Sequence, residues 1–299
     1  MNPAEVAADA MDVSLDKIED VTVMEKGMTN KSYLFTYNDI RYLLKIPENG
    51  ANELVNRKQE AAVYSVINGK GICDDTLYIN PENGIKISRF IENARVCDAS
   101  DWDDVSKCFS KLIDFHNMKL EIGHTFDLFY HIKYYESLWQ GRKSEHEDYT
   151  EVRNKVLSLR DFISSQNIRP ILTHIDANPD NFLISRADDG SERIQLIDWE
   201  YAGMQDKYLD IAMFAIYSGY HGEDIDKLID LYFSISGEEL TPDIRTRIYA
   251  YIAISGLIWS NWCEYKKICG VDFGEYALTQ YRYAADYVDI VLSDISKMS

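Results

Sequence analysis

The pattern of apolar and polar positions divides the chain into a strand-rich first part and a mainly helical second part. Between residues 21 and 91, Gly and Asn turn signals separate four segments rich in β-branched and aromatic residues: VTVMEKG, SYLFTYN, RYLLKIP and GIKISRFI. One helix, NELVNRKQEAAVYSVIN, interrupts them, with Val63 and Ile67 on one stripe and Glu60 one turn earlier on the same side. We place the boundary between the two parts near residues 91–97.

The second part is predicted to be helical on both sides of a single hairpin. Apolar residues recur with helical spacing in residues 101–118, 127–140 and 148–166, and again after the hairpin to the end of the chain. The hairpin is the segment FLISRADDGSERIQLIDWE, which has two short strand patterns around an Asp-Gly turn. It begins just after Asn181 and ends at Asp198, so the chain folds back on itself there.

Polar residues gather on both sides of this hairpin. The segment THIDANPDN contains His174, Asp176 and Asn181, and the hairpin brings Asp198 back toward them. Phosphoryl transfer needs a carboxylate to accept the proton of an attacking hydroxyl, and an acid and an amide oxygen to hold magnesium on the nucleotide phosphates. Each residue alone is explained equally well as a loop cap or turn former. The complete pattern indicates a phosphoryl-transfer site.

The first part contains residues that such a site requires. Lys45 interrupts an apolar strand, where an ammonium group needs an anionic partner or a phosphate. Glu60 is a plausible partner of the strand-lysine and helix-glutamate kind that kinases use, although a solvent-facing carboxylate explains it equally well. The segment EKGMTNKSY is a candidate phosphate loop, with Gly27 allowing a tight turn and Asn30 and Ser32 facing the nucleotide. It matches neither GxGxxG nor the P-loop pattern.

Composition narrows the function classes. The 299 residues include 50 acids and 31 bases, and the net charge of −19 argues against nucleic-acid binding and is compatible with a cationic ligand. Five cysteines without a CxxC pair suggest neither a disulfide framework nor a zinc site. The first twenty residues lack a basic segment followed by an apolar one, and no apolar run approaches 18 residues. We therefore expect a cytoplasmic protein without membrane insertion.

Longer motifs carry a resemblance to a known family. THIDANPDNFLI together with LIDWEYAGMQDKYLDIAMF resembles the choline/ethanolamine kinase family, and within it the bacterial LicA-type choline kinases; GMTNKSYLF and YLLKIPENG fit the start of that family. The resemblance implies an α+β, bilobal, protein-kinase-like fold. Residues 1–93 would form an N-lobe of antiparallel sheet plus helix, and residues 94–299 a larger, mainly helical C-lobe. It also implies transfer of phosphate from ATP, with Mg²⁺, to choline.

The same resemblance assigns roles to individual positions. Asp176 resembles the catalytic base, Asn181 and Asp198 resemble magnesium ligands, and Lys45 with Glu60 resembles the pair that positions the phosphates. Eukaryotic relatives often have arginine where Lys45 stands, which keeps the charge but changes the geometry.

Recognition of choline needs aromatic faces and a nearby carboxylate, because a quaternary ammonium has no hydrogen to donate. The candidates are Glu200 and Tyr201, directly after the strand-end acid, and Trp259 with Trp262, which lie three apart on a predicted helix. Aromatic residues on such a helix are also explained as core. Asp210 resembles a family position that braces the catalytic loop, and a helix cap is an equal explanation.

Other functions remain open at this stage. Ethanolamine is an alternative acceptor. An aminoglycoside or other amino-alcohol kinase would need several acids around the acceptor rather than paired tryptophans. A catalytically inactive binding module is disfavoured because no catalytic position is substituted. The small-molecule acceptor and the oligomeric state are not determined by the sequence.

Overall fold

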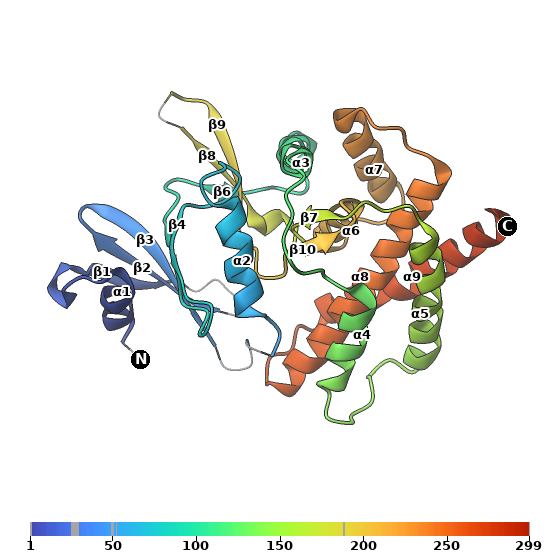
Figure 1. The fold of residues 1–299 in the computed structure, drawn as a ribbon. Coiled ribbons are helices and arrows are strands. Elements are labelled where there is room, and N and C mark those ends of the chain that lie inside the picture. The colour runs from blue at the N-terminus through green and yellow to red at the C-terminus, as the bar shows by residue number, and fades with distance from the viewer. Residues whose placement is uncertain (1, 25–29, 49–50, 52, 188, 299) are drawn as a thin grey trace.

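A five-stranded antiparallel sheet forms the first lobe of the computed structural model, which describes residues 2–24, 30–48, 51, 53–187 and 189–298 (Figure 1). Its strands lie in the order β1-β2-β3-β5-β4. They are β1 (Glu19–Met24), β2 (Asn30–Tyr37), β3 (Ile40–Pro47), β4 (Thr76–Ile79) and β5 (Lys86–Arg89). The sequence pattern predicts four of these strands; β4 is the one it misses.

Two longer helices flank this sheet. Helix α1 (Pro3–Met11), which the sequence did not suggest, packs through Val6 and its neighbours on sheet residues that include Phe35 and Leu44. A short 3₁₀ turn, η1 (Leu15–Lys17), leads from it into β1. Helix α2 (Arg57–Ile67) begins later than predicted because Asn56 caps it: the Asn56 side chain accepts a hydrogen bond from the Gln59 amide.

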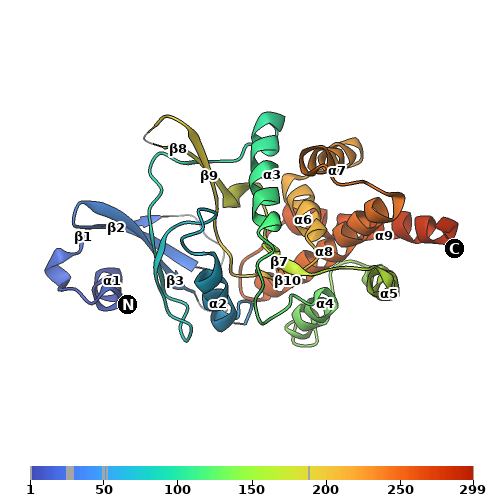
Figure 2. The ribbon, with the colours of Figure 1, turned by 45° about the horizontal axis from the view of Figure 1, so that its top comes forward.

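The second lobe is mainly helical and lies on the far side of α2 from β1 and β2 (Figures 1 and 2). Its helices are α3 (Trp102–Asn117), α4 (Leu128–Ser137), α5 (Tyr149–Ser165), α6 (Tyr208–Ser218), α7 (Glu223–Ser236), α8 (Pro242–Ile268) and α9 (Glu275–Met298). The three helices predicted ahead of the hairpin are confirmed with small shifts at their ends. At Gly256, α8 meets α9 so closely that an added Cβ would lie 2.6 Å from the Gln280 carbonyl oxygen.

Two small sheets carry the polar motifs. The predicted hairpin is confirmed as β8 (Phe182–Arg186) and β9 (Glu192–Leu196), and β6 (Arg95–Val96) joins it beside β8. A second pair is β7 (Ile171–Thr173) with β10 (Gly203–Gln205). β7 leads into the polar segment before the hairpin and β10 follows the polar segment after it, so their pairing holds the two segments together. The exact lobe boundary, between residues 93 and 94, stays a prediction.

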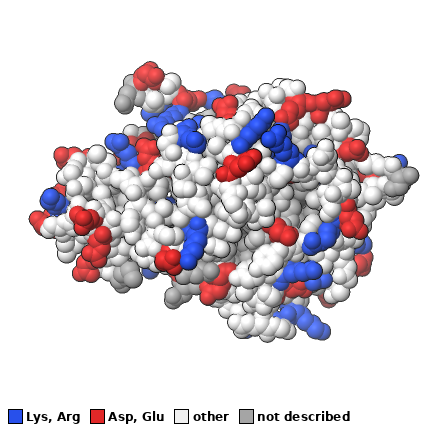
Figure 3. Space-filling model, viewed as in Figure 1, with Lys and Arg blue, Asp and Glu red and all other residues white. Residues whose placement is uncertain are grey.

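Two further features are the charge of the surface and the length of the apolar helices. On the face shown in Figure 3, lysine and arginine side chains lie among aspartates and glutamates. No helix in the described part of the chain is long and apolar enough to cross a membrane.

Candidate active site

The hairpin brings Asp176, Asn181 and Asp198 together, as the sequence predicts. Asn181 ends the 3₁₀ turn η2 (Pro179–Asn181), and its side-chain Nδ2 donates to the Asp176 carbonyl oxygen at 2.8 Å and to Asp176 Oδ2 at 3.0 Å. The Ile197 amide donates to the Asn181 carbonyl oxygen at 2.9 Å, so Asp198 follows directly beyond this pairing. The three residues form one cluster; their chemical roles remain predictions.

Asp210 holds the loop that contains Asp176. Its carboxylate accepts hydrogen bonds from the backbone amides of His174 at 3.1 Å and Ile175 at 2.8 Å, and it lies 2.9 Å from His116 Nε2. Ile175 has a φ of +70°, which is strained for a β-branched residue and persists only when its surroundings hold it. Of the two explanations for Asp210, the geometry supports the brace, since Lys207 occupies the cap position of α6.

The segment after the hairpin is strained in a similar way. Asp198 has a φ of +67°, and the next residue, Trp199, is fully buried with its indole Nε1 donating to the Leu196 carbonyl at 2.7 Å. His174 joins the two segments through a 2.9 Å contact from Nε2 to the Ile197 carbonyl oxygen. Burial lowers the pKa of His174, so a neutral imidazole donates this hydrogen bond.

The two acids of the site have pKa values far apart. Burial raises the pKa of Asp176 to about 7, the charges of Asp198 and Glu200 add to this, and a hydrogen bond from the Tyr217 hydroxyl opposes it. Burial also opposes ionisation of Asp198, but the positive charges of Lys45 and Lys86 outweigh burial and lower its pKa to about 2. One carboxylate can therefore exchange a proton near neutral pH while the other stays ionised.

The predicted pairing of Lys45 with Glu60 is wrong in this structure. Lys45 Nζ lies 2.9 Å from Asp198 Oδ1, whereas Glu60 contacts Lys86 Nζ at 3.3 Å and Arg57 Nη1 at 2.9 Å. Lys45 and Lys86 are opposite each other on β3 and β5, and Lys86 is the one that faces α2. Lys86 carries the same sequence signal as Lys45, a lysine within an apolar strand, but sequence reasoning did not single it out.

The candidate phosphate loop is described only in part. Gly27 lies outside the described residues. Asn30 is buried, and its Nδ2 donates to Glu200 Oε2 at 3.2 Å. Ser32 is also buried and pairs across the sheet with Lys45. Nucleotide contacts by Asn30 and Ser32 remain predictions.

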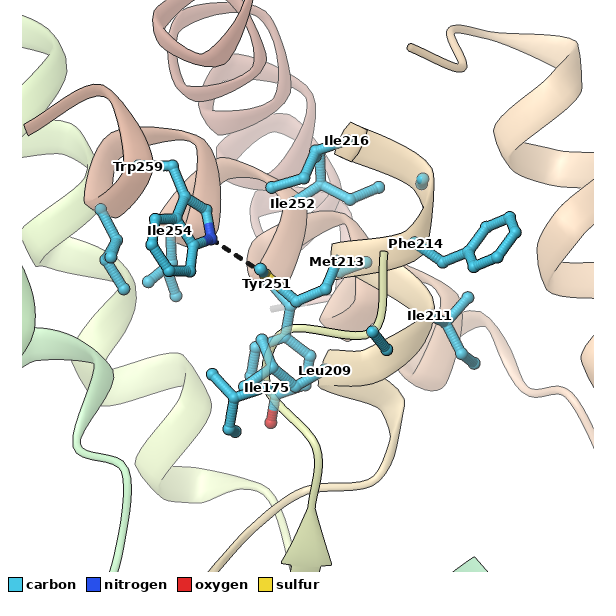
Figure 4. Packing of buried hydrophobic residues seen from close by; sticks show 14 of the residues in the cluster. Ile175, Leu209, Ile211, Met213, Phe214, Ile216, Tyr251, Ile252, Ile254 and Trp259 are labelled. Carbon is cyan, nitrogen blue, oxygen red and sulfur yellow. Dashed lines mark hydrogen bonds between the residues drawn. The ribbon is translucent and has the colours of Figure 1, made fainter. Parts of the chain in front are cut away.

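An aromatic cluster lies near Asp176, to which the Tyr217 hydroxyl donates a hydrogen bond. Tyr201 and Tyr217 each lie against Trp259, with ring centroids 5.2 and 6.0 Å apart, and Trp262 is 6.0 Å from Trp259. We define the cluster as these residues with two more that touch them, the full set being Tyr201, Tyr217, Trp259, Trp262, Phe273 and Tyr276. The Trp259 indole donates to the Met213 sulfur at 3.4 Å (Figure 4).

Sequence reasoning found only part of this cluster. Tyr217 and Tyr276 were missed because aromatic residues at helical spacing are usually core, and nothing local distinguishes these two. Glu200 was expected to face the acceptor, but its carboxylate contacts Asn30 and Arg57 of the first lobe. Glu200 and Tyr201 also border a cavity of about 530 Å³ between the start of α2 and α4.

Comparison with known proteins agrees with this geometry. The family model for choline/ethanolamine kinase matches residues 21–228. Protein LicA of Haemophilus influenzae is 25% identical over 264 residues, which cover 84% of this chain and 75% of LicA. The crystal structure of choline kinase LicA from Streptococcus pneumoniae has a TM-score of 0.79 and 27% identity, covering 95% of this chain and 98% of that one. LicA in complex with AMP has a TM-score of 0.77 and 26% identity, covering 96% and 98%.

The fold and the site together define a small-molecule phosphotransferase with the protein-kinase-like, α+β architecture. The family match extends over more than half of the chain and includes the loop, the hairpin and the brace. The chain belongs to the choline/ethanolamine kinase family.

Proposed function

We propose that this protein is a cytoplasmic choline kinase, which transfers the γ-phosphoryl group of ATP to the hydroxyl of choline and gives phosphocholine and ADP. The observation that carries the proposal is the position of the aromatic cluster beside a carboxylate whose pKa is about 7. The likeness to LicA supports the same acceptor.

Asp176 would act as the base. Its carboxylate is oriented by hydrogen bonds from Asn181 and Asn178, and the Tyr217 hydroxyl approaches it from the aromatic cluster. An acceptor hydroxyl placed between Tyr217 and the nucleotide would lose its proton to Asp176 as its oxygen attacks the γ-phosphorus. Lys45, which pairs with Asp198 in this structure, would contact the nucleotide phosphates.

Asn181 and Asp198 would hold Mg²⁺. The Asn181 Nδ2 is used by Asp176, which leaves its amide oxygen to face a cation, and Asp198 is a permanent anion with one oxygen on Lys45. Amide and carboxylate oxygens are the donors that this hard cation prefers, so the donor set fits. The metal, when bound, neutralises charge on the phosphates.

The aromatic cluster would bind the cationic end of the acceptor. Trimethylammonium gains from ring faces without losing hydrogen bonds, whereas the smaller, strongly hydrated ammonium of ethanolamine gains less. The cluster therefore favours choline over ethanolamine, the alternative acceptor.

A coupled ADP-release assay over choline, ethanolamine and aminoglycosides tests the proposal. We expect Mg²⁺-dependent turnover that is highest with choline. Preference for ethanolamine or for an aminoglycoside would refute choline as the acceptor while leaving the kinase assignment intact, and ADP release that no acceptor stimulates would count against the whole proposal.

A further inference from the structure

Helix α2 lies where the two lobes meet (Figure 1). Arg57, its first residue, joins three separate elements. Its Nη1 lies 2.9 Å from Glu60 Oε2 on the same helix and 3.4 Å from Glu200 Oε2 in the segment after the hairpin. Its Nη2 donates to Asn30 Oδ1 on β2 at 3.3 Å, and Asn30 in turn donates to Glu200. The guanidinium therefore connects a helix and a strand of the first lobe to a loop of the second.

These contacts belong to a buried network of charged side chains. Glu60 also contacts Lys86, so two cations and two carboxylates lie together, each less than 9% exposed. Ionised groups so far from water must be paired closely. Without Arg57, the Glu60 and Glu200 carboxylates would each lose a cationic partner.

Arg57 also has a site shaped to receive it. Its side chain passes over Gly84, where a Cβ would lie 2.6 Å from Arg57 Cδ and Nε. Gly84 is in the turn that leads into β5 and has a φ of +72°, a conformation that glycine adopts without strain. The turn therefore leaves room for the arginine.

Glu200 matters because it lies two residues after Asp198. The backbone at Asp198 is in the left-handed region, and such a conformation persists only where neighbouring groups hold it. Trp199, the next residue, is anchored in the second lobe by burial and by its hydrogen bond to the Leu196 carbonyl. Glu200, one residue further on, is anchored to the first lobe by Arg57 and Asn30.

We propose that Arg57 is a positioning residue: by fixing Glu200, it sets the backbone that presents the Asp198 carboxylate. The start of α2 thereby controls whether the predicted magnesium ligand is in place. This inference rests on the proposed function, because it takes Asp198 as a metal ligand. Arg57 itself touches neither metal nor phosphate in this role.

The test compares Arg57→Met and Arg57→Lys with Lys58→Met, a matched control whose side chain is exposed and pairs only with exposed Glu82 among the described residues. The readout is the Mg²⁺ concentration that half-saturates ADP binding in calorimetry, together with ADP affinity without Mg²⁺. We expect Arg57→Met to raise the half-saturating Mg²⁺ concentration by about 10- to 100-fold, the scale typical of groups that orient metal ligands. Arg57→Lys should show a smaller rise, and Lys58→Met none.

A double-mutant cycle with Glu200→Gln separates this role from others. If Arg57 acts through Glu200, Arg57→Met should add little to the effect of Glu200→Gln. Additive effects, an unchanged Mg²⁺ requirement, or an equal loss of ADP affinity without Mg²⁺ would overturn the proposal. Circular dichroism checks folding; if Arg57→Met does not fold, Arg57→Lys in the same cycle distinguishes these outcomes. Calorimetry needs no acceptor, so failure of choline turnover leaves this test intact.

Discussion

Asp176 and Asp198 show how the surroundings of a residue set its chemistry. Both are partly buried aspartates, yet the pKa of one is raised to about 7 and that of the other is lowered to about 2. The difference comes from their neighbours, since Lys45 and Lys86 face Asp198 while Asp176 faces other acids. The same type of side chain thus exchanges a proton near neutral pH at one position and stays ionised at the other.

Asp176→Asn should separate catalysis from stability. Loss of the proton acceptor should reduce kcat by about 10² or more. The folded pKa of about 7 exceeds the ordinary value of 3.8, so the ionised carboxylate costs stability that grows as pH rises from about 4 to about 7. At pH 8 the variant should be more stable than the wild type by up to about 4 kcal/mol, because one pKa unit corresponds to about 1.4 kcal/mol.

Urea unfolding at pH 8 and pH 4 measures this difference, which should disappear at the lower pH. Turnover close to that of the wild type would remove Asp176 from the mechanism. Equal stability at both pH values would contradict the raised pKa.

The pH profile of kcat/KM gives a second residue-level prediction. A base with a pKa of about 7 should make activity fall as pH decreases below about 7. The Tyr217 hydroxyl stabilises the ionised form, so Tyr217→Phe should move this acidic limb to higher pH. Tyr220→Phe is the control, because that hydroxyl donates to the Ala99 carbonyl instead. An acidic limb at the same pH in both variants would show that Asp176 does not govern it.

At the scale of elements, the loop that contains Asp176 depends on α6 for its shape. The loop has no regular structure around Ile175, and the carboxylate of Asp210 in the first turn of α6 binds two successive backbone amides. The register of the β8–β9 hairpin positions Asp198 on the other side of the site. A loop between β7 and η2 is therefore held by elements that follow it in the chain.

Asp210→Ala should leave the His174 and Ile175 amides buried and unpaired. Stability should fall by at least about 2 kcal/mol, because each unsatisfied buried donor costs about 1–3 kcal/mol. Since the loop also carries Asp176, kcat should fall as well. Asp224→Ala, in the first turn of α7 and exposed, is the matched control. Thermal melts and steady-state kinetics measure both effects; a stable variant with normal kcat would contradict the brace.

At the scale of the whole molecule, the aromatic cluster that we propose as the acceptor site is assembled from distant segments. Tyr201 follows the hairpin, Tyr217 lies near the end of α6, the tryptophans come from α8, and Tyr276 lies at the start of α9. Trp259 and Trp262 are only 4% and 3% exposed, so they also support the core.

Trp259→Leu and Trp262→Leu should therefore change two properties. Loss of an indole face, worth roughly 0.5–2 kcal/mol, should raise the choline KM by about two- to thirty-fold while the ATP KM stays nearly constant. Both variants should also melt at lower temperature. Trp139→Leu is the control: it is equally buried, but its indole donates to the Asn261 carbonyl outside the aromatic cluster. An equal rise in choline KM for Trp139→Leu would indicate a purely structural effect.

Local patterns in the sequence determined a large part of this protein. The Asp-Gly turn and the two apolar runs set the hairpin, and the hairpin returns Asp198 to Asn181, which contacts Asp176. Apolar residues at helical spacing predict the three helices before the hairpin, and the predicted bounds agree with the structure to within a few residues. These features depend on neighbours along the chain, which is why the sequence alone predicts them.

Only the tertiary structure decided which residues face each other across elements. Lys45 and Lys86 have the same local signal, a lysine within an apolar strand. In the structure, Glu60 of α2 contacts Lys86 on β5, and Lys45 pairs with Asp198. Glu200 turns toward Arg57, and Tyr217 toward Asp176, for the same kind of reason. The partners of a side chain depend on helix rotation and strand order. Both arise from burial over the whole chain, so they cannot be predicted from the residues around a single position.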